Sequence, residues 1–171
     1  ALARQNLALV VSSGRRLNNL VNDILDFAKI NAHSLEIHHK PVSLNVAAEV
    51  VLGVSQVLFA GKSLVLKNDI SASLPPVKGD EDRLQQILHN LIGNAIKFTD
   101  SGTVTLSARV VAEPTELPQD LVAARALSFP LVAISVTDTG IGIPKEKTTL
   151  IFQSFEQIDG SSTRQYGGTC L

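Results

Sequence analysis

Three polar side chains at helical spacing are the first candidates for chemistry: Asn90, Asn94 and Lys97. At about 100° per residue, these positions of a helix fall within about 60° of one another and form one polar stripe. Two amide oxygens one turn apart can hold a hard divalent cation, and a nearby ammonium can reach a phosphate oxygen. The stripe suits a magnesium-bound nucleotide, although a helix considered alone more often carries such residues as a plain solvated face.

A second candidate group is DTGIGIP, residues 138–144, which follows a predicted strand. Asp138 can accept a hydrogen bond from an exocyclic amine such as that of adenine. Gly140 and Gly142 let the backbone approach a flat ring and permit a positive φ at the turn. A short glycine pattern after a strand is weak evidence alone, and a plain turn explains it about as well. The chain has neither the GxGxxG dinucleotide pattern nor the GxxxxGK[ST] phosphate loop.

A helix from Asp80 to about Lys97 must position the amide stripe. Asp80 is a good N-cap, and acidic residues follow it in the first turn, where the helix dipole favours negative charge. The 3.6-residue period predicts one buried apolar face opposite the amides. Its members are Leu84, Ile87, Leu88, Leu91, Ile92 and Ala95.

The elements around this helix alternate between strand and helix patterns, which predicts an α/β fold in two layers, with a mixed sheet packed on helices. Residues 35–44 read as a short strand broken by Pro41, and Ser43 or Asn45 caps a helix that runs to about Phe59. Strands are expected at residues 62–70, 104–111 and 129–136, with a turn at 99–103 and a loop containing a helical turn after 111. From Thr137 onward, a mobile active-site loop is expected.

Residues 2–31 read as one long helix of coiled-coil type at the N-terminal end. Leu17, Leu20, Ile24 and Phe27 recur at alternating spacings of three and four, which is the pattern of a seam between packed helices. We expect this helix to pack against partner helices, and an ordinary core helix is the alternative.

Composition excludes several classes of protein. With 171 residues, 44% of them hydrophobic and 18% charged, the chain should fold around one main core. A net charge of −1 gives no basic surface for nucleic acid. The single cysteine, Cys170, excludes an internal disulfide, and no apolar run approaches the roughly 20 residues of a membrane span. The start without methionine and the end at GGTCL suggest a piece of a longer protein.

Four motifs in order resemble the histidine kinase branch of the superfamily that includes type II topoisomerases, mismatch-repair ATPases and the ninety-kilodalton chaperones, whose domain has the Bergerat fold. DRLQQILHNLIGNAIKFT is similar to the asparagine box and DTGIGIP to the first glycine box. IFQSFEQID is similar to the phenylalanine box and YGGTCL to the start of the second glycine box. LNNLVNDILDFAKI resembles the second helix of the dimerisation and phosphotransfer hairpin. The resemblance therefore divides the chain into a hairpin helix, 1–33, and an ATP-binding catalytic domain, 34–171.

The resemblance implies a role for each matching residue toward ATP and Mg²⁺. Asn90 and Asn94 would bind magnesium and phosphates, Lys97 would bind phosphate, and Asp138 would bind the adenine amine. The purine pocket would be shaped by Gly140, Gly142 and Ile143. A lid over the nucleotide would be anchored by Phe152 and Phe155 and would approach the phosphates through Arg164, Gly167, Gly168 and Thr169.

The resemblance favours a kinase over a hydrolase. Hydrolytic members place a glutamate one turn before the magnesium asparagine, and Asn90, which stands there, cannot act as a general base. The acceptor motif HE[LF]RTPL has no counterpart in the chain, so the implied partners are the missing phosphotransfer helix, a response-regulator receiver domain and a second copy bound through the N-terminal helix. The catalytic domain would lie in the cytoplasm, and membrane attachment of the longer protein stays open.

Cys170 departs from the family pattern, which has glycine at that position of the second glycine box. A side chain there would crowd the phosphates or stiffen the lid. The alternative function is therefore a degenerate nucleotide-binding domain that serves as a dimeric, non-catalytic signalling scaffold.

Overall fold

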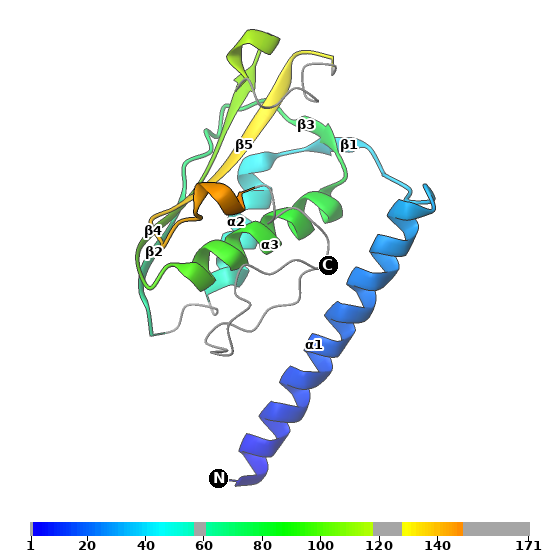
Figure 1. Ribbon diagram of the computed structural model, residues 1–171. Helices are drawn as coiled ribbons and strands as arrows, with labels where there is room; N and C mark the ends of the chain where they lie inside the picture. The colour runs from blue at the N-terminus through cyan, green and yellow to red at the C-terminus, as the bar shows by residue number, and fades with distance from the viewer. Residues whose placement is uncertain (1, 57–60, 118–127, 149–171) are drawn as a thin grey trace. The chain divides into compact units, whose positions relative to one another are not determined.

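The computed structural model describes residues 2–56, 61–117 and 128–148 (Figure 1). The chain forms two compact units, of which one contains residues 1–36 and 143–171 and the other Ile37–Gly142. In the first unit, the N-terminal segment is a single helix, α1 (Leu2–Asn31), as its periodicity predicts. A short 3₁₀ turn, η4 (Lys145–Lys147), belongs to the same unit.

Helix α1 leaves a series of large apolar side chains exposed along its length. They include two residues of the predicted seam, Leu17 and Ile24, which are 63% and 53% exposed. The others are Leu7, Val10, Val11, Val21, Leu25 and Ile30. Among the described residues, no helix has the length and apolar character that crossing a bilayer requires.

The described residues of the second unit form helices, two small groups of strands and the 3₁₀ turn η2. In chain order its elements are β1 (Lys40–Val42), α2 (Leu44–Ser55), β2 (Ser63–Asn68), β3 (Val77–Gly79), α3 (Glu81–Phe98), β4 (Ser101–Val111), η2 (Pro114–Glu116) and β5 (Leu131–Asp138). The turn η2 confirms the helical turn expected after residue 111.

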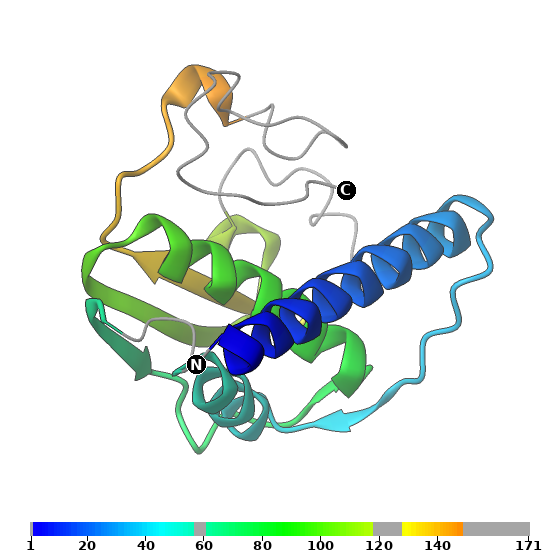
Figure 2. The same cartoon turned by 90° about the horizontal axis from the view of Figure 1, so that it is seen from below.

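A mixed three-stranded sheet with the order β2-β4-β5 forms one layer of this unit. β2 and β4 run parallel, with Ser63 beside Ser101, and α3 lies in the crossover that joins them. β4 and β5 are antiparallel, with Val104 beside Asp138. Helices α2 and α3 cover one face of the sheet (Figure 2), and β1 pairs with β3 in a small antiparallel ribbon. The predicted two-layer α/β fold is confirmed.

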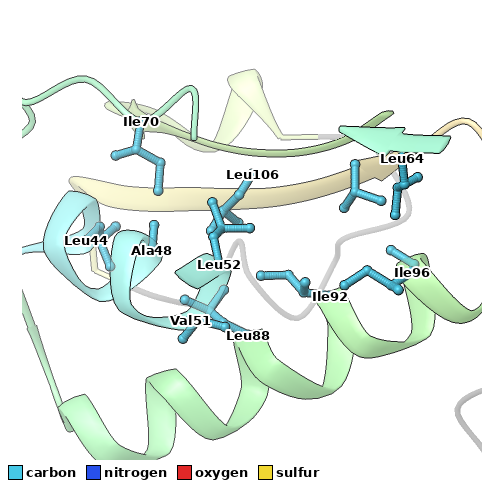
Figure 3. Close-up of a cluster of buried hydrophobic side chains, with 12 residues drawn as sticks. Leu44, Ala48, Val51, Leu52, Leu64, Ile70, Leu88, Ile92, Ile96 and Leu106 are labelled. Carbon is cyan, nitrogen blue, oxygen red and sulfur yellow. The ribbon is translucent and has the colours of Figure 1, made fainter. Parts of the chain in front are cut away.

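The core lies between the sheet and the two helices (Figure 3). Leu88 and Ile92 from α3 meet Leu64 from β2 and Leu106 from β4 there, and all four are at least 93% buried. α2 contributes a second row, of Leu44, Ala48, Val51 and Leu52. Apolar burial of this kind contributes about 25 cal/mol per Å², so this layer stabilises the packing of α3 against the sheet.

Two predictions of burial on α3 are wrong. Ile87 and Leu91 are 56% and 45% exposed, while Ile96, which the predicted face omitted, is 2% exposed. The buried arc of the helix is therefore rotated toward Ile96, because the sheet and α2 cover only part of the apolar surface of α3. An apolar period gives the width of such a face but not which part of it a neighbour covers.

Several element boundaries also differ from the predictions. α2 ends at Ser55, four residues before the predicted end, and β3 was not predicted because three residues carry no period. Ser43 is the N-cap of α2, but its side chain makes no capping hydrogen bond. β5 ends at Asp138 instead of residue 136, and the strand therefore includes this residue.

Candidate functional site

Asp80 fixes the N-terminal end of α3, as predicted. Its Oδ1 accepts a hydrogen bond from the backbone N–H of Arg83 at 3.2 Å, and its Oδ2 accepts one from the backbone N–H of His38 at 2.9 Å. The hydrogen bond from His38, followed by the one from Arg83, lowers the pKa of Asp80 below its ordinary value of 3.8. The same carboxylate thus caps the helix and ties it to the segment before β1.

The amides of the stripe are available for a ligand. Asn90 and Asn94 are exposed on α3, and neither side chain has a hydrogen-bond partner among the described residues. One helical turn, about 6 Å of rise, separates them. The ammonium of Lys97 lies 4.8 Å from the centre of the Phe98 ring, a cation–π contact at the C-terminal end of the stripe.

Asp138 is delivered by the last position of β5. Its exposed carboxylate accepts a hydrogen bond through Oδ1 from the backbone N–H of Gly140 at 2.8 Å. This bond holds one carboxylate oxygen in a tight turn. Oδ2 has no partner in the part of the chain that the structure describes, so it can accept a hydrogen bond from a ligand.

The turn after Asp138 contacts the last turn of α3 directly. The backbone N–H of Ile141 donates to the carbonyl of Phe98 at 3.3 Å. A Cβ added to Gly140 would overlap that same carbonyl oxygen and would lie 2.7 Å from Thr99 Oγ1. Because Phe98 is one turn after Asn94, the carboxylate and the amide stripe belong to one region of the second unit.

Thr99 lies beneath this contact. Its side chain is fully buried, and within residues 2–56, 61–117 and 128–148 its hydroxyl has no hydrogen-bond partner. Burying an unpaired hydroxyl costs on the order of 1–3 kcal/mol. Thr99 was expected to lie in a turn, with no role in the site.

The remaining predicted residues are distributed as follows. Gly142 has φ of 69°, in the left-handed region, as expected for a glycine at this turn. Ile143 is 50% exposed and begins the second segment of the other unit. Phe152, Phe155, Arg164, Gly167, Gly168 and Thr169 lie outside the described residues, as does Cys170.

The donor set fits a magnesium-bound nucleotide. Neutral amide oxygens are ligands that a hard cation accepts, and those of Asn90 and Asn94 have no partner within the described ranges of the chain. The carboxylate of Asp138 can receive an amine, and the missing side chain at Gly140 allows the turn to lie against α3. The site therefore has two groups of ligand-binding side chains: the amides suit the metal-bound end of one ligand, and the carboxylate of Asp138 suits its amine end.

Lys62 also belongs to this region, although its sequence pattern predicted no such role. Its ammonium contacts carbonyls in the last turn of α3, which lies 34 to 37 residues later in the chain. One signal pointed toward such a contact: no glycine follows the helix immediately, so the usual C-terminal cap is absent. The partner itself is a tertiary contact that no local pattern identifies.

Known proteins match this chain along most of its length. A model of the family described as histidine kinase-, DNA gyrase B-, and HSP90-like ATPase matches residues 79–171, which is more than half of the chain. Signal transduction histidine-protein kinase BarA of Escherichia coli is 38% identical over 171 residues, covering 98% of this chain. Hybrid signal transduction histidine kinase K of Dictyostelium discoideum is 37% identical over 163 residues, covering 95% of this chain.

A solved structure shares the arrangement as well. Full-length ShkA in complex with AMPPNP superposes with a TM-score of 0.71 at 32% identity, over 94% of this chain and 31% of ShkA. The chain spans 17% of the length of BarA and 13% of the length of kinase K. With the mixed sheet, the exposed amides of α3 and the turn after Asp138, these matches show that the chain belongs to the histidine kinase-, DNA gyrase B- and HSP90-like ATPase family, among the sensor histidine kinases.

Proposed function

We propose that this chain binds Mg·ATP and serves as the catalytic part of a sensor kinase that transfers the γ-phosphate to a histidine of a phosphotransfer helix. The observation that carries the proposal is the hydrogen bond from Ile141 to Phe98. It joins the turn that carries Asp138 to the helix that carries Asn90 and Asn94. The nucleotide held by ShkA supports the same assignment.

Each residue of the site has a separate task in this proposal. Asp138 accepts the exocyclic amine of adenine through Oδ2, while its Oδ1 stays bonded to Gly140. Asn90 and Asn94 hold the magnesium ion, which neutralises charge on the phosphates when it is bound. Lys97 reaches a phosphate oxygen by leaving the ring of Phe98.

The amides favour phosphoryl transfer over hydrolysis. A water molecule must lose a proton when it attacks the γ-phosphate, and neither Asn90 nor Asn94 can accept a proton near neutral pH. A neutral imidazole nitrogen needs no such base, and transfer to it depends mainly on positioning and on charge stabilisation. The residues of the stripe supply those two effects.

We propose further that α1 is the second helix of a dimerisation and phosphotransfer hairpin. Its exposed apolar residues, including Leu17 and Ile24, would pack against the other hairpin helix and against a second copy of the chain. A receiver domain of a response regulator would then take the phosphate from the histidine. Exposure of these side chains supports the pairing, since large apolar surfaces of this kind usually mark interfaces.

Titration calorimetry with Mg·ATP tests the nucleotide site in the longest polypeptide that contains this chain. We expect Asn94→Ala and Asp138→Ala each to raise the Kd of Mg·ATP by at least about tenfold. Gln85→Ala, on the same helix, and Asp69→Ala, an exposed carboxylate outside the site, should bind as the wild type does. If both site variants bind Mg·ATP as tightly as these controls, the proposed site is wrong.

A second measurement separates a kinase from a nucleotide-binding scaffold. The polypeptide is mixed with a hairpin that carries the acceptor histidine, and acid-labile phosphate on the histidine is followed after addition of Mg·ATP. A kinase forms phosphohistidine, and a scaffold that binds nucleotide forms none. Cys170→Gly then shows whether the unusual residue of the second glycine box reduces the rate.

A further inference from the structure

Lys62 makes a cluster of contacts that the proposed function does not use. Its Nζ donates to the carbonyl oxygens of Ile96 at 2.8 Å, Lys97 at 3.2 Å and Thr99 at 3.0 Å. The ammonium also pairs with Asp100 Oδ1 at 3.3 Å, and the Lys62 side chain is 26% exposed. A residue just before β2 therefore binds the C-terminal end of α3.

The end of α3 requires such a partner. The last four carbonyls of any helix receive no hydrogen bond from an N–H group of the helix, and the helix dipole places partial negative charge on them. Many helices resolve this with a left-handed glycine, but the C-cap residue here, Thr99, has an extended backbone with φ of −118° and ψ of 115°. The Lys62 ammonium satisfies three of these carbonyls and places a positive charge at the negative end of the dipole.

The same turn of α3 carries contacts of the nucleotide site. The carbonyl of Phe98 accepts a hydrogen bond from Ile141, and Lys97 ends the amide stripe. Lys62 therefore binds the carbonyls of Lys97 and Thr99 while the turn after Asp138 binds the carbonyl of Phe98 between them. These bonds together fix where Asp138 lies relative to Asn94.

We propose that Lys62 is a positioning residue of the nucleotide site, which keeps the purine-binding carboxylate and the phosphate-binding stripe at the separation that one ATP molecule requires. The proposal rests on the proposed function. Lys62 itself would touch no part of the nucleotide. The ion pair with Asp100 contributes little, since its carboxylate is 77% exposed and surface pairs are weak. The hydrogen bonds to the helix carbonyls carry the effect.

Lys62→Met tests the proposal, because methionine keeps an apolar stem of similar length and removes the ammonium. Adenosine contacts one end of the site, whereas Mg·ATP must contact both. We expect the Kd of Mg·ATP to rise at least tenfold and the Kd of adenosine to change by less than twofold. Lys67→Met is the matched control, because Lys67 is an exposed lysine of β2, and it should change neither Kd.

Lys62→Arg and Lys62→Gln accompany the methionine variant and carry the test if that variant does not fold. A planar guanidinium cannot converge on three carbonyls as an ammonium does, and the shorter glutamine carries no charge. We therefore expect each of these two variants to weaken Mg·ATP binding severalfold while adenosine binding is retained. Circular dichroism establishes at which temperature each variant is folded.

Two results would overturn the role of Lys62. One is an unchanged Kd of Mg·ATP in the folded variants, and the other is an equal rise in the Kd of both ligands, which indicates general destabilisation. In either case wild-type binding of Mg·ATP would leave the proposed function intact. A wild type that binds no Mg·ATP would instead contradict the proposed function.

Discussion

Replacement of Gly140 by alanine tests the contact that joins the two halves of the site. The added Cβ would overlap the carbonyl oxygen of Phe98, and it would lie 2.7 Å from Thr99 Oγ1 and 2.9 Å from Asp138 Oδ1. To reach ordinary contact at 3.4 Å, these two oxygens must retreat by about 0.7 Å and 0.5 Å. A backbone carbonyl cannot rotate away as a side chain can, so the turn itself must leave the helix.

The expected cost has a structural and a functional part. Overpacking of this kind lowers the free energy of unfolding by about 1–3 kcal/mol, and the backbone clash places Gly140→Ala in the upper half of that range. Displacing Asp138 removes a charge-assisted hydrogen bond to the purine amine, which is worth about 1.5–3 kcal/mol. That loss corresponds to a rise of roughly 10- to 150-fold in the Kd of Mg·ATP.

Gly142 provides the control, because its constraint has a different origin. An added Cβ there meets no atom within 4 Å, but φ is 69°, which asparagine tolerates better than alanine. We expect Gly142→Asn to leave the free energy of unfolding nearly unchanged and Gly142→Ala to lower it by about 1–2 kcal/mol. At position 140 asparagine should be at least as harmful as alanine. Urea denaturation and calorimetry measure both effects, and wild-type values for Gly140→Ala would refute the close-contact reasoning.

Three further predictions concern stability and are checked by urea denaturation. Leu88→Ala should lower the free energy of unfolding by about 2–5 kcal/mol, whereas Ile87→Ala should stay within about 0.5 kcal/mol, because Leu88 is 1% exposed and Ile87 56%. Equal losses would contradict the observed orientation of α3. Asp80 has a lowered pKa, so its charge stabilises the fold above pH 3.8 and this stabilisation disappears as the pH falls through the folded-state pKa. Asp80→Asn keeps a side-chain oxygen for the helix cap but removes the charge. The variant should therefore have a lower free energy of unfolding than the wild type near neutral pH, and the two values should converge at low pH. Thr99→Val should leave stability unchanged or raise it by about 1 kcal/mol, since it removes a buried hydroxyl that has no partner in the described part of the chain, and a loss above about 1 kcal/mol would show that the hydroxyl has a partner.

Local patterns in the sequence predicted the parts of the site that depend on local structure. The cap at Asp80 and the apolar period gave α3 and therefore the common face of Asn90 and Asn94. The strand before DTGIGIP gave the position of Asp138 at a strand end. These features follow from helix geometry and from side-chain alternation, which are properties of consecutive residues.

Contacts between distant residues were not predictable in this way. No period or propensity indicates that Lys62 binds the end of α3, or that the hydroxyl of Thr99 is buried. The exposure of Ile87 was also mispredicted, because burial depends on which neighbours cover the helix. The joining of the carboxylate to the amide stripe could be inferred from the family resemblance, but its physical basis, the bond from Ile141 to Phe98, required the structure.

The parallel pairing of β2 with β4 determines where this domain can be cut. The match to the family begins at Gly79, and a fragment or chimera that starts there keeps Asn94 and Asp138. It would nevertheless discard six of the twelve core residues, namely Leu44, Ala48, Val51, Leu52, Leu64 and Ile70. It would also leave β4 with an unpaired edge, which invites association between chains. Functional shuffling of such domains, in evolution or in the laboratory, should therefore use a border near Ile37, where the compact unit begins.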